Sequence, residues 1–115
     1  MITSTVTGNV GKQPELITTK TGKPMVRFSL ASTFKKEGSE PATTWVDVTC
    51  FDEQATVVSE RVNKGDRVTV IGRMQLETYD KKDGSEGHSL RIIADEVGLS
   101  LRFPKRETQP VAEPW

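Results

Sequence analysis

Three aromatic residues occupy strand positions at which the alternation of side chains would place a polar residue. In the segment 45–51, small apolar residues alternate with a second set that contains Trp45 and Phe51. Successive side chains of a strand point to opposite faces, so we expect the small apolar set in the core and both aromatics outside. Tyr79 shares its face of the segment 67–79 with polar residues and is also expected to point outward. Such rings can stack on nucleic-acid bases, at roughly 1–3 kcal/mol per base and with little sequence preference.

Basic side chains near these aromatics could hold the phosphates of a nucleic acid. Arg27 and Arg73 are expected to point outward from their strands. Phe34 lies at the start of the first long polar loop, where it is either an anchor of that loop or a further stacking residue. Four lysines lie in the two long polar loops, namely Lys35, Lys36, Lys81 and Lys82.

The sequence offers no constellation for catalysis or for a metal centre. It contains one cysteine, Cys50, and one histidine, His88, so neither an internal disulfide nor a cysteine zinc cluster is expected. It also contains no phosphate-binding glycine loop, no nucleophile–base pair and no paired carboxylates in apolar surroundings. We therefore expect a protein that is not an enzyme and that needs no cofactor.

Most of the chain has the alternation or the β-branched composition of strands. Between the third and fourth expected strands, Ala55, Val58 and Val62 have the spacing of a short helix, with Asp52 as its N-cap and Gly65 after its end. This order fits an all-β, five-stranded OB-fold barrel with one short helix between strands 3 and 4, and an SH3-like barrel is the structural alternative. The expected strands cover residues 2–8 continued by 16–19, 25–32, 45–51, 67–79 and 89–94, with 97–103 as an extension.

The chain has 115 residues, the size of one domain. We expect residues 1–103 to form the OB-fold domain and residues 104–115, with three prolines, to form a disordered C-terminal tail. The 16 basic and 16 acidic residues cancel, but residues 1–36 carry six basic residues against one acidic, which suits an anionic partner. The sequence has no apolar run long enough for a membrane span and no recognisable signal peptide, so a cytoplasmic protein is expected.

Five segments, at residues 6–11, 28–32, 44–51, 62–68 and 71–74, carry a specific resemblance, and the stretch VNKGDRVTVIGRM is its strongest part. In this order and spacing they resemble the bacterial single-stranded DNA-binding protein (SSB) family, over about residues 2–103. The resemblance implies an OB-fold, a homotetramer and sequence-tolerant binding of single-stranded DNA without catalysis. Trp45, Phe51 and Tyr79 match positions at which the family places base-stacking aromatics, and Phe34 lies near another.

The chain also departs from the family pattern in two respects. The family often has basic residues near its stacking aromatics, whereas here Asp47, Glu53 and Glu77 each lie two positions from one of them. Fewer cations predict a shallower dependence of DNA affinity on salt. Residues 104–115 lack the long linker and acidic tip through which the family recruits replication and repair proteins. The chain therefore resembles a short paralogue, and recruitment of replication or recombination proteins through its tail is not favoured.

Two functions follow from these observations. The first is sequence-nonspecific binding of single-stranded DNA, which would protect it in replication, recombination or repair. The alternative is an OB-fold adaptor of a replication or restart complex, in which Trp45 and Phe51 are buried at a subunit or partner interface. The acidic neighbours of the aromatics favour the alternative, and stacking leaves RNA open as a ligand.

Overall fold

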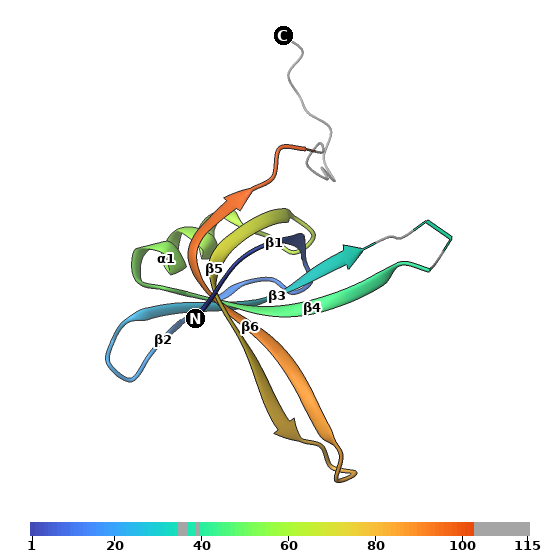
Figure 1. Cartoon of the computed structure of the whole chain (residues 1–115). Helices are drawn as coiled ribbons and strands as arrows, with labels where there is room; N and C mark the ends of the chain where they lie inside the picture. The colour runs from blue at the N-terminus through green and yellow to red at the C-terminus, as the bar shows by residue number, and fades with distance from the viewer. Residues whose placement is uncertain (35–36, 39, 103–115) are drawn as a thin grey trace.

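The computed structural model describes residues 1–34, 37–38 and 40–102. These residues form six strands and one helix (Figure 1). The expected tail at 104–115 lies outside the described residues and stays a prediction. In chain order the elements are β1 (Ile2–Val10), β2 (Glu15–Thr18), β3 (Pro24–Phe34), β4 (Ala42–Phe51), α1 (Asp52–Arg61), β5 (Arg67–Asp80) and β6 (Glu86–Leu99).

Five of the strands close into a barrel. The sheet has the order β1-β5-β6-β4-β3-β2, and the end of β1 also pairs with β3 through Asn9 and Val10, which completes the ring. The pairings are antiparallel except for β4 with β6. With α1 between its third and fourth strands, this barrel confirms the predicted OB-fold.

β2 is the one strand outside the ring. The composition of residues 16–19 predicts a continuation of the first strand, but residues 11–14 interrupt the pairing. β2 then pairs with the outer half of β3, Glu15 opposite Arg27 and Thr18 opposite Pro24. Pro14 has no N–H to donate to a sheet, which is consistent with a break at this point.

The core is apolar throughout the described residues, which bury no polar or charged residue. The alternation of side chains correctly predicted which residues are buried and which point outward in β3, β4 and the first half of β5. Cys50 lies among these buried side chains, as predicted, and burial raises the pKa of its thiol to about 11. The fully enclosed larger side chains are Leu30, Ile92, Val26, Val48, Val68, Val70 and Cys50.

Helix α1 follows β4 without a loop, and this corrects one expectation. Asp52 is the first helical residue, not the N-cap, because Phe51 at the end of β4 already supplies the extended position. Asp52 has φ of 60°, and the helix has no side-chain cap. Gly65 does not stop the helix, which ends at Arg61. It forms the turn before β5, with φ of 92° and its N–H donating to the carbonyl of Val10.

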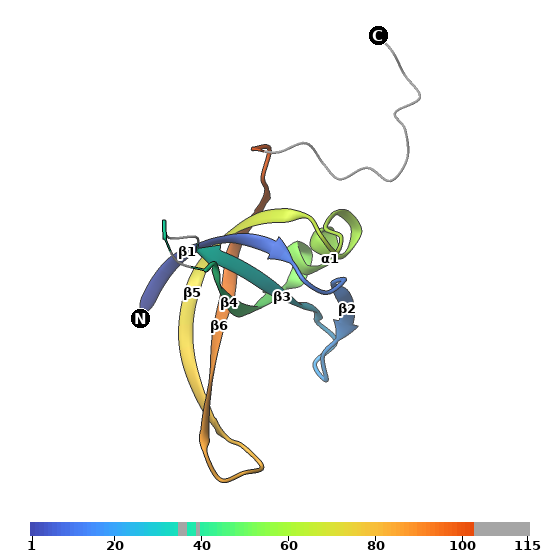
Figure 2. The same ribbon diagram turned by 90° about the vertical axis from the view of Figure 1, so that its right-hand side faces the viewer.

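Three hairpins project from the barrel, formed by β2–β3, β3–β4 and β5–β6 (Figures 1 and 2). The β5–β6 hairpin is the longest in pairing, with strands matched from Gly72–Ala94 out to Asp80–Glu86. Of the polar loop predicted at 80–87, residues 81–85 form the turn of the β5–β6 hairpin, and the remaining residues belong to its strands. Part of the polar loop predicted at 35–43 lies outside the described residues. Helix α1 is too short and too polar to span a membrane, and it is the helix that the described residues contain.

Candidate nucleic-acid interface

The outer sides of β2, β3, β4, β6 and β5 form a continuous surface that carries the three predicted aromatics, and we call it the aromatic face. Trp45 is 57% exposed, Phe51 39% and Tyr79 51%. Val46 and Cys50, the neighbours of Trp45 and Phe51 on β4, are buried, so the alternation separated these two aromatics from the core. Tyr79 is exposed as predicted, but it lies in the outer half of β5, where Thr78 and Asp80 on either side are exposed as well. Their exposure is thus a property of the fold, and their role in binding stays a prediction.

Trp45 and Tyr79 line one hollow of this face, and Phe51 lines a second. The first hollow lies between β4 and the β5–β6 hairpin, and the second lies between the start of β1 and the middle of the sheet. Glu77 and Arg91 border both hollows and therefore join them. The structure thus brings the three aromatics to one surface from two different strands.

Glycines set the positions of two of the rings. A Cβ built on Gly11 would lie 2.5 Å from Cζ3 of Trp45, and one built on Gly87 would lie 2.5 Å from Cζ of Tyr79. Tyr79 is the cross-strand partner of Gly87, so its ring covers a backbone that has no side chain of its own. Both rings therefore rest on the protein and keep their outer sides accessible.

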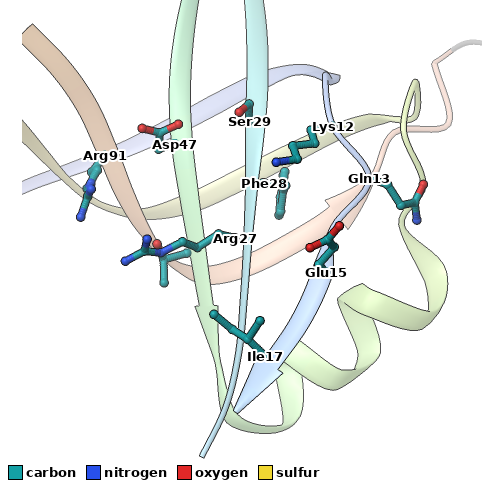
Figure 3. A pocket seen from close by; sticks show the side chains of 10 residues that line it. Lys12, Gln13, Glu15, Ile17, Arg27, Phe28, Ser29, Asp47 and Arg91 are labelled. Carbon is teal, nitrogen blue, oxygen red and sulfur yellow. The ribbon is translucent and has the colours of Figure 1, made fainter. Parts of the chain in front are cut away.

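A third hollow extends the aromatic face over β2 and β3 (Figure 3). Arg27 reaches across β4 from β3 and lines this hollow together with Lys12 from the β1–β2 connection. Arg27 and Arg73 also line the hollow of Phe51, so both arginines lie where the sequence predicted, on the outer side of the sheet. These cations could hold phosphates beside the rings.

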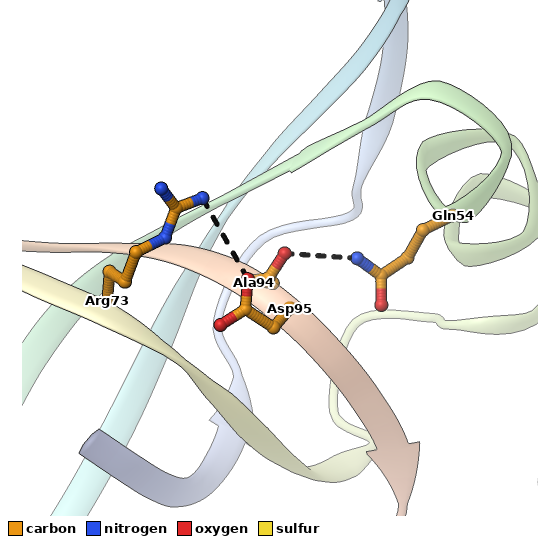
Figure 4. A network of polar contacts seen from close by, with 4 residues as sticks. All are labelled: Gln54, Arg73, Ala94 and Asp95. Carbon is orange, nitrogen blue, oxygen red and sulfur yellow. Dashed lines mark hydrogen bonds and ion pairs between the residues drawn. The ribbon is translucent and has the colours of Figure 1, made fainter. Parts of the chain in front are cut away.

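Two arginines of the aromatic face, Arg73 and Arg91, have carboxylate partners. The terminal nitrogen Nη2 of Arg73 lies 3.8 Å from Oδ1 of Asp95, next to the hydrogen bond that Gln54 of α1 donates to the carbonyl of Ala94 (Figure 4). Nε of Arg91 lies 3.3 Å from Oε2 of Glu77. The aromatic face is therefore less basic than its arginines alone suggest.

The remaining predicted residues lie away from the three hollows or outside the described residues. Phe34 is 70% exposed at the end of β3 and lines none of the three hollows. Lys81 and Lys82 are exposed in the β5–β6 turn, also outside these hollows. Lys35 and Lys36 lie outside the described residues. The structure thus groups the three aromatics with Arg27 and Arg73, and separates Phe34, Lys81 and Lys82 from them.

Two cations of the aromatic face were missed in the sequence. Arg91 lies two positions from Ser89 and Ile93 on the outer side of β6, so the alternation that identified Arg73 could have identified it. Lys12 lies in the turn-like segment after β1, where periodicity gives no direction for a side chain. In the described residues, no group of three or more His, Cys, Asp or Glu side chains could hold a metal ion.

The fold and the surface together define an OB-fold protein with an exposed aromatic face. Similar proteins of known family support this fold. The model of the single-strand binding protein family matches residues 1–100. A crystal structure of a small single-stranded DNA-binding protein from Streptomyces coelicolor superposes with a TM-score of 0.75. It is 31% identical and covers 87% of this chain and 94% of its own. The chain belongs to the single-strand binding protein family.

The curated relatives of this chain are also named as single-stranded DNA-binding proteins. A single-stranded DNA-binding protein of Paenarthrobacter aurescens is 35% identical over 88% of this chain and 63% of its own length. Single-stranded DNA-binding protein 3 of Clostridium acetobutylicum is 37% identical over 78% of this chain and 64% of its own. The chain spans about half to two thirds of the length of the curated relatives it matches. The family is one of non-enzymatic proteins, in agreement with the expectation from the sequence.

Proposed function

We propose that this protein binds single-stranded DNA without sequence preference. Bases stack on Trp45, Phe51 and Tyr79, while Arg27 and Arg73 contact the phosphates. The observation that carries this function is the exposure of three large aromatics on one face of a barrel whose core is closed and apolar. The names of its relatives as single-stranded DNA-binding proteins support the same function.

The proposal extends to the process, the location and the further DNA contacts of this protein. Coating would protect single strands during replication, recombination or repair, and the protein would act in the cytoplasm at the nucleoid. Phe34 and the four loop lysines would extend the contact along a longer strand. A domain over residues 1–103 would carry all of this activity, without catalysis or a cofactor.

A homotetramer belongs to the same proposal. One copy of the chain leaves several large apolar side chains exposed on β1, β5 and β6, among them Ile2, Ile71, Leu76 and Leu99. Association would bury such side chains and would pair the free edges of strands. Light scattering of the protein at two concentrations would give the mass of the assembly directly.

Binding of a labelled dT oligomer tests the function. Trp45→Ala and Phe51→Ala should each weaken the affinity at least about tenfold, because each removes a stacked base worth roughly 1–3 kcal/mol. Val57→Ala on α1 is the matched control, since it also truncates an exposed apolar residue but lies outside the three hollows. Unchanged affinity in both aromatic variants would refute the site.

Tryptophan emission distinguishes the adaptor alternative from DNA binding, because in an adaptor Trp45 is covered by protein. In an adaptor, tryptophan emission would change when subunits or protein partners associate and would stay constant when DNA is added. An oligomer of rU beside the dT oligomer would show whether the protein prefers DNA to RNA.

A further inference from the structure

Arg91 on β6 lies at the junction of the three hollows of the aromatic face. It lines the hollow of Trp45 and Tyr79, the hollow of Phe51 and the hollow over β2 and β3. Among the described residues that line these hollows, Arg91 is the one that borders all three. A cation in this position can reach a phosphate between any two of the bases that the aromatics hold.

Arg91 has an acidic partner on the neighbouring strand. Gln75 and Glu77 of β5 lie opposite Arg91 and Ser89 of β6, so Glu77 is the diagonal neighbour of Arg91. The ion pair uses Nε of Arg91, at 3.3 Å from Oε2 of Glu77. The guanidinium of Arg91 makes no hydrogen bond in the described part of the chain apart from this ion pair.

Both members of this pair are accessible to a ligand. Their side chains are 43% exposed for Arg91 and 40% for Glu77. Ion pairs at such exposure are weak, because water and salt screen them. A phosphate offers a guanidinium two or more charge-assisted hydrogen bonds in one plane, which is a stronger interaction. An arriving phosphate can therefore displace the carboxylate.

We propose that Arg91 binds a phosphate of single-stranded DNA and that Glu77 competes with this phosphate for the guanidinium. This inference rests on the proposed function and adds to it a residue and a restraint on affinity. Glu77 is paired with the guanidinium of Arg91 in the free protein, and this ion pair breaks when DNA binds. The chain thus carries an internal anion that lowers its affinity for DNA.

The competition also lowers the salt dependence of binding. A cation of the protein that neutralises a phosphate releases counterions, which gives a slope of about −0.7 per contact for single strands. Salt also screens the ion pair between Arg91 and Glu77, which makes Arg91 easier to release for DNA. The two effects oppose each other, so the contact at Arg91 adds less to the slope in the native chain than it would without Glu77.

Glu77→Gln tests the competition, because it removes the charge and keeps the size of the side chain. The affinity for a dT oligomer at low salt should rise about three- to tenfold, and the slope of log K against log salt should steepen by up to about 0.7, the value of one whole contact. Arg91→Gln should weaken binding, and Arg91→Lys should restore part of it, since Lys keeps the charge but not the planar fork.

The matched control is Glu60→Gln on α1, which makes the same change of charge outside the three hollows. Its effect on affinity should be smaller than that of Glu77→Gln, because Glu60 borders none of the three hollows and forms no ion pair with Arg91. Circular dichroism and a thermal melt of each variant would confirm the fold. If Glu77→Gln changes the affinity and slope no more than Glu60→Gln does, the inference is wrong.

The double variant Glu77→Gln, Arg91→Gln separates competition from simple repulsion. Competition predicts that the gain from Glu77→Gln disappears when Arg91 is absent. An equal gain in both backgrounds would mean that Glu77 repels DNA independently, and would overturn the inference. A native protein that binds no dT oligomer at low salt would refute the proposed function itself, and this inference with it.

Discussion

The indole ring of Trp45 lies against Gly11, so closely that a methyl group on the glycine would be 2.5 Å from Cζ3 and 2.9 Å from Cη2. Gly11 is held in place because its N–H donates to the carbonyl of Ser29, at 2.8 Å. The connection between β1 and β2 is thereby fixed on β3 beneath the ring. The most exposed of the three aromatics thus owes its position to a residue without a side chain.

Gly11→Ala should therefore reduce DNA binding with little loss of stability. The new methyl group pushes the ring aside, because the backbone of Gly11 is fixed and the end of the Trp45 side chain can move. We expect affinity for a dT oligomer to fall about fivefold or more, in line with a weakened stack, while the thermal midpoint changes little. Native affinity together with an unchanged emission maximum would contradict this positioning role.

Gly87→Ala makes the equivalent change beneath Tyr79. A Cβ there would meet Cζ and Cε2 of the ring, at 2.5 and 2.6 Å, so the ring must leave the glycine. Loss of this cross-strand cover should weaken binding by a few fold if a base stacks on Tyr79. Tyr79→Ala provides the comparison. If its effect equals that of Gly87→Ala and the two are not additive, both act through the ring; additive effects would argue against this.

Gly72→Ala should destabilise the fold instead of the site. Gly72 follows the irregularity in the β5–β6 pairing, and an added Cβ would collide with the carbonyl oxygen of Ile93. Backbone cannot move aside as a side chain can, so we expect a loss of about 1–3 kcal/mol, the usual range for overpacking. Gly98→Ala is the control on β6, where nothing lies within 4 Å of the new atom. Equal denaturant midpoints for the two variants would contradict the prediction.

The buried thiol of Cys50 should make the folded protein less stable at alkaline pH. Burial raises the pKa of its thiol from 9.0 to about 11, so the unfolded chain loses this proton at lower pH than the folded chain. The contribution of Cys50 is complete below pH 9 and is lost as the pH rises through about 11. Other groups titrate in this range, so Cys50→Val is the reference. Denaturant unfolding of both proteins should diverge above pH 9, and parallel curves would be evidence against the assigned pKa.

The sequence predicted those features that depend on alternation along a single strand. The period of two separated Trp45 and Phe51 from the buried face of β4, and the same period located Tyr79 and Arg73 on β5. Because the faces of one strand follow from its own residues, the buried faces of β3, β4 and the first half of β5 were correctly assigned. The outer half of β5 projects from the barrel, so Leu76, which the alternation placed on the core face, is exposed. The order of strands and helix indicated an OB-fold and left an SH3-like barrel as the alternative, which the observed topology excludes.

Features that depend on contacts between distant segments could not be predicted in this way. The contact of Trp45 with Gly11 and the ion pair of Arg91 with Glu77 require the sheet register, which one sequence does not specify. The start of α1 was misassigned for a related reason. A side-chain cap at Asp52 was expected from its residue type, whereas β4 runs directly into the helix.

The fluorescence of Trp45 is the most direct measure of whether this residue stacks on a base of single-stranded DNA. A dT oligomer should be titrated into the native protein and into Trp45→Ala at low and at high salt, with Trp115 as the common background. We expect strong quenching of the native emission that weakens with salt, and little quenching in the variant. No quenching of the native protein at low salt, or equal quenching in both proteins, would contradict this stacking.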